Sequence, residues 1–461
     1  MGRFRAIGTF VVAAAVAGCN SSNAIPNQPA SLHTIKHVVI MLQENRSFDN
    51  IFAGFPGADT TLTGACKPAP WCKTGTAPLT PVSLETTDRL GLGTDIDHSH
   101  HGFEVECDFD SAAGACRNDG FDKIRFGESG TGELAKLYPY AYVERSESKP
   151  YWDIAGRYAL ADHMFFTETA SSFIAHQIIL SGTVALNSKE SLTDEPNRQP
   201  WGCDAPAFTT TPILHSDGKE SLNGPFPCFT QWGTMADLLD AADVSWKYYV
   251  DDFQGKNSDF SGGVWDGYDA IKKVRYGADW KNVSMPNTTV FSDLKNGTLP
   301  SVSWLIPTLA DSDHPASGCN HGPQWVTTVI DTIGKSKYWN DTAIILLWDD
   351  WGGWYDNVPP AQTNYTSLGF RVPMILISPY ARPKYISSTP YQFGSILKYV
   401  EQNFGLGSLH TTDESSTSIG DMFDYTQKPT PFVSEPIPKV KSCMGAPTAQ
   451  EIIEHDGGVP E

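Results

Sequence analysis

Residues 36–42 read KHVVIML, an apolar run that leads directly into the polar residues Gln43, Glu44 and Asn45. An unbroken apolar run of this length is typical of a strand buried on both faces, because a strand with one face in water alternates. Three later stretches have the same pattern: 302–306 (VSWLI), 343–348 (AIILLW) and 372–378 (VPMILIS). Helical patterns lie between and after them, at 172–180, 324–333 and 392–404. This alternation predicts an α/β fold, a three-layer sandwich around a mostly parallel central sheet.

The composition is that of an acidic globular chain. Of its 461 residues 40% are hydrophobic, and the formal net charge is −20. A disordered chain has too little apolar surface to fold, and a nucleic-acid partner requires a basic face, so both classes are excluded. The stretches 53–130 and 185–300 are rich in Gly, Pro, Asp and Cys. We interpret them as loop insertions in a single domain over 35–461. The sequence predicts no oligomeric state.

The first 18 residues have the pattern of a secretory signal peptide. Arg3 and Arg5 precede an apolar run that is too short to span a bilayer and ends in small residues. Residues 16–19 read VAGC, which resembles a bacterial lipobox and predicts that Cys19 is lipidated. An ordinary signal peptide cleaved nearby is the alternative. Residues 19–34 then form a polar tether. We therefore expect export and a membrane anchor through lipid only, facing the periplasm or the cell exterior.

Eight cysteines remain after Cys19, an even number that an oxidising compartment favours. No CxxC pair occurs, which disfavours a cysteine metal site. Since short loops close most readily, the expected disulfides are Cys66–Cys72, Cys107–Cys116, Cys203–Cys228 and Cys319–Cys443.

Acidic residues follow two of the predicted strands. Glu44 comes just after the first strand, and Asp349 and Asp350 follow the strand at 343–348. Because buried carboxylates require compensation, these three could supply hard oxygen ligands to a divalent metal ion. In the alternative interpretation, Asp349 and Asp350 only cap a turn before Gly352 and Gly353.

A set of ordered motifs extends from residue 37 to residue 424. The first, 37–49, reads HVVIMLQENRSFD. The others are 97–101 (DHSHH), 118–122 (NDGFD), 160–166 (LADHMFF), 170–176 (ASSFIAH), 313–315 (DHP), 347–356 (LWDDWGGWYD) and 421–424 (DMFD). Together they resemble the bacterial phosphoesterase family of phosphatidylcholine-type phospholipases C and secreted acid phosphatases. That family has the alkaline-phosphatase-like fold.

The resemblance implies metal-dependent hydrolysis of phosphate esters through a phosphoserine intermediate. It assigns roles to seven residues: Ser172 as nucleophile, His98 and His314 as contacts of the phosphoryl group, and Glu44, Asn45, Asp349 and Asp350 at a divalent metal of unknown identity. Both phosphomonoesters and phospholipid headgroups fit this reaction. A serine at a helix start faces free backbone N–H groups, and a metal ion lowers its pKa.

Several alternatives remain open. Ser172 could be a simple N-cap, and Ser171, where the family usually has proline, competes with it as nucleophile. The trio His98, His100 and His101 could ligate zinc, whereas His163 and His176 are interpreted as core histidines. Asn357 replaces a histidine of the family pattern.

Two classes other than an enzyme also remain. One is a non-catalytic surface lipoprotein that binds phosphorylated ligands on a decayed site. The other is an exported carbohydrate-binding protein, for which the 13 tryptophans would line a cleft. The intact acidic residues and Ser172 argue against both.

Overall fold

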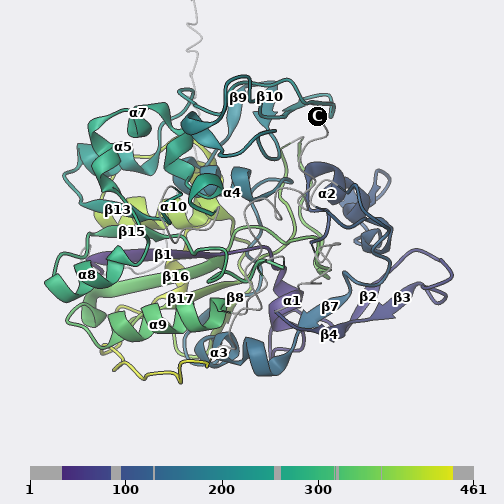
Figure 1. The fold of residues 1–461 in the computed structure, drawn as a ribbon. Helices are drawn as coiled ribbons and strands as arrows, with labels where there is room; N and C mark the ends of the chain where they lie inside the picture. Colours follow the sequence, from purple (N-terminus) through teal and green to yellow (C-terminus); the bar gives the residue numbers. More distant parts are fainter. Residues whose placement is uncertain are drawn as a thin grey trace, which may run out of the picture. The chain divides into compact units, whose positions relative to one another are not determined.

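An eight-stranded sheet, in the order β14-β13-β15-β1-β16-β17-β8-β18, forms the centre of the fold (Figure 1). The structure is a computed structural model that describes residues 34–84, 95–127, 130–253, 261–315, 317, 321–364 and 366–439. The sheet strands are β1 (His37–Gln43), β8 (Ala159–Ala161), β13 (Trp246–Tyr249), β14 (Val283–Ser284), β15 (Val302–Leu305), β16 (Thr342–Trp348), β17 (Met374–Ile377) and β18 (Tyr385–Ser387). Only β17 runs antiparallel to its neighbours among these eight strands. The predicted mostly parallel sheet is confirmed.

The central strand β1 explains the apolar run that opens the sequence analysis. Val38 pairs with Val302 of β15 on one side and with Ala343 of β16 on the other. All three side chains are fully buried. Because helices cover both faces of the sheet, neither face of β1 reaches water, and both of its alternating sets of side chains are apolar.

Helices lie on both sides of the sheet (Figure 1). Helices α4 (Ser172–Ser181) and α10 (Phe393–Phe404) pack together on one side, and α3 (Arg145–Ala155) and α9 (Gly322–Gly334) pack together on the other. Every residue of α4 is buried, and six of its ten residues are apolar. These layers confirm the three-layer sandwich.

The remaining elements surround this core. The other helices are α1 (Phe48–Phe52), α2 (His100–Cys107), α5 (Met235–Ala241), α6 (Ser261–Val264), α7 (Lys272–Arg275), α8 (Thr289–Asn296) and α11 (Thr412–Ser415). The small sheets comprise β2 (Thr63–Ala65), β3 (Thr76–Pro78), β4 (Thr80–Val82), β5 (Phe109–Asp110), β6 (Ala115–Cys116), β7 (Ala141–Val143), β9 (Ala185–Asn187), β10 (Glu190–Leu192), β11 (Ile213–His215) and β12 (Glu220–Ser221).

The stretch 185–300, which we expected to decorate the core, also contributes to it. Its strands β13 and β14 belong to the central sheet, where β13 pairs with β15. The sequence of β13, WKYY, has no aliphatic run, so the pattern did not indicate a buried strand. Its polar atoms have partners instead, since Lys247 forms an ion pair of 2.6 Å with Asp293 and Tyr249 donates a hydrogen bond to the same carboxylate.

Three of the four expected disulfides are present: Cys66–Cys72, Cys107–Cys116 and Cys203–Cys228. Cys319 and Cys443 lie outside the described residues, as do the predicted signal peptide and Cys19. Within the described ranges, no helix combines the length and the apolar character needed to cross a bilayer.

Candidate active site

The candidate site lies where the parallel strands β1 and β16 end. The last residues of the two strands, Gln43 and Trp348, pair with each other in the sheet. The residues that follow them, Glu44 and Asp349, are therefore neighbours although about 300 residues separate them in the chain. Crevices at the carboxyl ends of parallel strands are the usual location of ligand sites in open α/β sheets.

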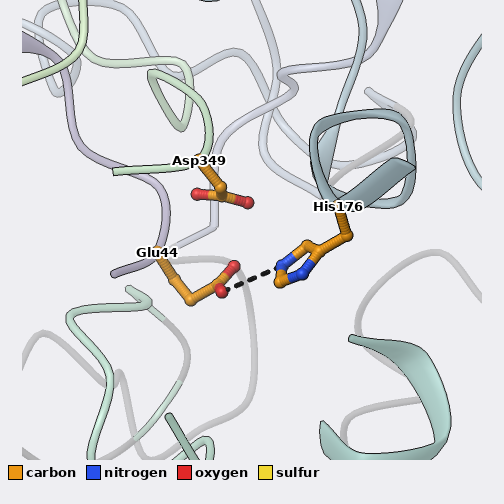
Figure 2. A group of neighbouring side chains, drawn as sticks. All are labelled: Glu44, His176 and Asp349. Carbon is orange, nitrogen blue, oxygen red and sulfur yellow. Dashed lines mark hydrogen bonds and ion pairs between the residues drawn. The ribbon is translucent and has the colours of Figure 1, made fainter. Parts of the chain in front are cut away.

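Glu44 and Asp349 form a buried group with a third residue, His176 of α4 (Figure 2). One ligand atom from each residue lies within 4.8 Å of the other two. The His176 ring points at Glu44, with Nε2 at 3.2 Å from Oε1. All three side chains are fully buried.

The electrostatics of this group fit a divalent cation. Burial, together with the neighbouring charge of Asp349, raises the pKa values of Glu44 and Asp350 well above their usual range. Burial lowers the pKa of His176 to about 4, so this imidazole is neutral and does not compensate the acids. Glu44 Oε2, Asp349 Oδ2 and Asn45 Oδ1 are buried without a hydrogen-bond partner among the described residues. Such an oxygen-rich set is the kind that divalent metal ions bind.

Asn45 connects the two strand ends to a histidine. Its backbone is left-handed, with a φ of 55°, and its N–H donates a 2.9 Å hydrogen bond to Asp349 Oδ1. Its side-chain Nδ2 lies 2.9 Å from His98 Nε2. The loop after β16 approaches so closely that a Cβ at Gly352 would lie 2.3 Å from the Asn45 carbonyl oxygen. Gly352, whose φ is 60°, is therefore required for this close packing.

Ser172 is the first residue of α4 and faces the acidic residues. Its Oγ donates a 3.2 Å hydrogen bond to Asp350 Oδ2, and the other oxygen of Asp350 accepts a 2.7 Å bond from the Gly352 N–H. Asp350 thus lies with the serine and not in the group of Glu44, His176 and Asp349. Ser171 is the N-cap, but its Oγ makes no capping bond and is buried without a partner among the described residues. The two adjacent serines therefore have different environments.

The histidines His98 and His314 are both buried, but their pKa values are shifted in opposite directions. Burial alone would lower the pKa of His98, but the charges of Asp350 and Asp95 and the Ile96 carbonyl, 2.6 Å from Nδ1, raise it to about 10. For His314, burial and the positive charges of His98 and Arg46 lower the pKa to about 3. The pKa values of the two histidines are therefore shifted in opposite directions.

A buried network fixes the residue that precedes His314. The Asp313 carboxylate accepts hydrogen bonds from Tyr151 Oη at 3.1 Å and from Trp348 Nε1 at 3.0 Å. Its backbone N–H donates a 2.9 Å bond to Gln43 Oε1. Because Asp313 is held by residues of α3, β16 and β1, the position of His314 next to it is fixed as well.

The other candidate histidines lie elsewhere. His100 Nδ1 is 2.7 Å from Thr169 Oγ1 and His101 is exposed, so His98, His100 and His101 do not gather around one point. His163 is partly exposed and lies 3.2 Å from Asp59 Oδ2. His176 is buried, but beside the acids and not only among core side chains. Its spacing of four residues from Ser172 was the available signal, because such residues share one face of a helix.

Asn357, which replaces a histidine of the family pattern, lies in a different buried network. Its side-chain oxygen accepts a 2.7 Å hydrogen bond from Arg371, whose guanidinium also forms two bonds with Asp356, at 2.7 and 3.1 Å. Its Nδ2 donates to Asp59 at 3.2 Å. In this chain, position 357 thus supports the Arg371 network.

Comparisons with known proteins concern the family of this chain. A model of the phosphoesterase family matches residues 35–407. Phospholipase C A of Mycobacterium tuberculosis is 26% identical over 469 residues, which cover 90% of this chain and 84% of that protein. Hemolytic phospholipase C of Pseudomonas aeruginosa is 24% identical over 456 residues, 86% of this chain and 56% of that protein. A crystal structure of an alkaline phosphatase superfamily protein from Vibrio parahaemolyticus is 13% identical, covers 59% of this chain and 65% of its own, and has a TM-score of 0.33, too low to add to the fold described above.

Proposed function

This chain belongs to the phosphoesterase family, and on that premise we propose that it hydrolyses phosphate esters by attack of Ser172 on phosphorus. As a family member it is a hydrolase of phosphoester bonds. The observation that carries the assignment to Ser172 is its hydrogen bond of 3.2 Å to Asp350 at the start of a buried helix. The free N–H groups and the positive dipole end of α4 favour a bound phosphoryl group at the same place.

The reaction would have two steps. In the first, Ser172 Oγ forms a bond to phosphorus, the bond from phosphorus to the leaving alcohol breaks, and the serine proton passes to Asp350, which already accepts its hydrogen bond. In the second, water attacks the phosphoserine, the bond from phosphorus to Ser172 Oγ breaks, and phosphate or a phosphomonoester is released. Asp350 returns its proton to the Ser172 oxygen, and a proton of the water passes to the histidine that protonated the alcohol. The alcohol leaves with a proton that a histidine supplies.

His98 is the better candidate for that proton, because the charges of Asp350 and Asp95 raise its pKa. His314 is held neutral beside it and can accept a hydrogen bond from the substrate or from the attacking water. Both side chains are buried.

Glu44, Asn45, Asp349 and Asp350 would hold the divalent metal ion, through oxygens that include three without a hydrogen-bond partner in the described structure. When bound, the metal would neutralise charge on the phosphoryl oxygens and lower the pKa of the serine hydroxyl. The protein's part is to keep these carboxylates together in a buried site, where each would be costly alone. The intact set disfavours a decayed, purely binding protein.

The substrate class that we propose includes phospholipids, because two relatives of this chain are phospholipases C by name. A cavity of about 520 Å³ lies beside α2, and Phe103, Glu104 and Leu214 are among its lining residues. Two of its other lining residues, His100 and Thr169, lie two and three residues from His98 and Ser172. This cavity could receive the alcohol part of the substrate.

We also propose that the protein is exported and anchored by lipid at Cys19, on the strength of the signal-peptide pattern and residues 16–19. Three disulfides suit an oxidising compartment.

The test of the proposed function is a substrate panel. Purified protein is freed of metal with a chelator and assayed on p-nitrophenyl phosphate, bis-p-nitrophenyl phosphate and phosphatidylcholine vesicles, before and after single divalent ions are added back. We expect activity on at least one of these esters that chelation abolishes and one ion restores. Hydrolysis of none of them with any ion would contradict the proposal.

A further inference from the structure

The group of Glu44, Asp349 and His176 contains one nitrogen donor, and the distances between its donor atoms can be compared with those around a single metal ion. Donor atoms that share one ion at about 2.0–2.2 Å lie about 3.0–3.4 Å apart in octahedral or tetrahedral arrangements. His176 Nε2 and Glu44 Oε1 are 3.2 Å apart, and all three donors lie within 4.8 Å of one another. Figure 2 shows the imidazole directed at the two carboxylates from the opposite side.

Two features hold the His176 ring in this direction. His176 is four residues after Ser172 on α4, so both side chains leave the same face of a helix that is buried along its whole length. The Trp265 ring lies nearly parallel to the imidazole, with an interplanar angle of 4° and centroids 6.3 Å apart. The helix and the tryptophan thus place His176 Nε2 one helical turn after Ser172, the candidate nucleophile.

A simple hydrogen bond from His176 to Glu44 does not account for the whole group. Such a bond would satisfy Glu44 Oε1 but would leave Glu44 Oε2 and Asp349 Oδ2 buried without a partner among the described residues. A cation shared by the three side chains satisfies both carboxylates and uses the nitrogen as well.

From this geometry we infer that His176 is a nitrogen ligand of the active-site metal and makes the site select Zn²⁺ over Ca²⁺ and Mg²⁺. Imidazole suits zinc and its first-row neighbours, whereas a site of carboxylates, amide oxygen and hydroxyl alone suits the harder ions. The inference rests on the proposed metal-dependent hydrolysis, and it assigns to this chain a ligand that the sequence motifs had not indicated.

The test compares metal binding by the wild type, His176→Gln and the control His163→Gln. Gln replaces the imidazole with an amide whose oxygen is a hard ligand, and His163 is a histidine of the same chain that contacts Asp59 instead. Affinities for Zn²⁺, Mg²⁺ and Ca²⁺ are measured by competition titration on metal-free full-length protein. We expect His176→Gln to lose about 100-fold or more in zinc affinity, with little change in its affinity for Ca²⁺. A loss of this size exceeds the usual effect of removing a residue that only hydrogen-bonds to a metal ligand. His163→Gln should bind as the wild type does.

X-ray absorption at the zinc edge provides a second measurement. The zinc-loaded wild type should have one more imidazole in its coordination shell than zinc-loaded His176→Gln. If His176→Gln does not fold, the zinc-loaded double variant His98→Gln/His314→Gln addresses the same point, because His176 must then still give an imidazole signal. An unchanged zinc preference in His176→Gln, or no imidazole in the double variant, would overturn the inference.

These outcomes are separable from those of the proposed function. Metal-dependent ester hydrolysis together with unchanged zinc selectivity in His176→Gln would refute the nitrogen ligand alone. Loss of zinc selectivity in a protein that hydrolyses none of the test esters would refute the proposed function alone.

Discussion

The hydroxyl of Ser172 donates a hydrogen bond to Asp350 although 178 residues separate them in the chain. The bond joins the start of α4 to the loop after β16, the two elements that carry the serine and the acidic pair. Asp350 therefore has a different position from Asp349, which lies with Glu44 and His176. The side chains of the adjacent aspartates thus contact different residues, Ser172 for Asp350 and the Asn45 N–H for Asp349.

Substitution of the two neighbouring serines should affect the turnover rate to very different extents. Ser172→Ala removes the proposed nucleophile and should lower kcat by about 10³-fold or more, since the two-step path is lost. Ser171→Ala should cost little, because its Oγ makes no capping bond. Steady-state kinetics on the best ester of the panel measure both. Similar losses in the two variants would contradict the assignment.

Asp349→Asn should abolish metal binding while the fold persists. The neutral amide has nearly the same shape, can still accept the hydrogen bond from the Asn45 N–H, and removes a charge from a buried group. Elemental analysis should find the metal absent from the variant, with a thermal midpoint no lower than that of the metal-free wild type. Asp331→Asn, a buried aspartate on α9 that pairs with Lys335, is the control and should retain the metal. Stoichiometric metal in Asp349→Asn would refute its role as ligand.

Glu401 on α10 should make stability depend on pH. Burial, and further the nearby Asp413, raises its pKa to about 7. Because the folded protein then keeps a proton that the unfolded chain releases above about pH 4.5, stability falls as pH rises from about 4.5 to 7. Glu401→Gln cannot ionise and can still accept the hydrogen bond from the Leu409 N–H.

Urea unfolding at pH 5 and pH 8 measures this contribution. Glu401→Gln should exceed the wild type by about 1–2 kcal/mol at pH 8, after allowance for solvent screening, and by little at pH 5. An equal pH dependence in both proteins would exclude Glu401 as the cause.

Cys19→Ser should release the protein from the membrane fraction and abolish its labelling by a fatty-acid analogue. Lipidation requires the cysteine thiol, and serine keeps the size of the side chain without it. Fractionation and labelling of both proteins in the producing bacterium are the measurement. The proposed lipid anchor would be contradicted if the wild type took up no label and fractionated as the variant does.

The central strands could be predicted because burial on both faces leaves a simple signature, an unbroken apolar run. The runs at 36–42, 302–306 and 343–348 correspond to β1, β15 and β16 within one residue at each end. Strand β13 could not be predicted in this way, since its Lys247 and Tyr249 share a polar partner, Asp293, that lies 44 residues or more along the chain.

The site could be predicted where residues follow a strand directly, as Glu44 and Asp349 do. His176 was missed because most of the residues around it in sequence are apolar, and an apolar context is typical of core histidines. Its partner, Glu44, is 132 residues away, and only the packing of α4 beside the ends of β1 and β16 brings them together. The separate environments of Ser171 and Ser172 likewise depend on how α4 is docked, which the sequence alone does not specify.

The central claim is that the phosphoryl group passes through Ser172, and trapping the intermediate tests it most directly. Wild-type protein is quenched with acid during turnover of its best ester and digested, and the phosphopeptides are sequenced by fragmentation so that Ser171 and Ser172 are distinguished. The account predicts phosphate, or the phosphoryl moiety of a diester, on Ser172 and on no neighbouring residue. An unmodified Ser172 under conditions that trap such intermediates, together with near-normal rates in Ser172→Ala, would contradict it and favour direct attack by water.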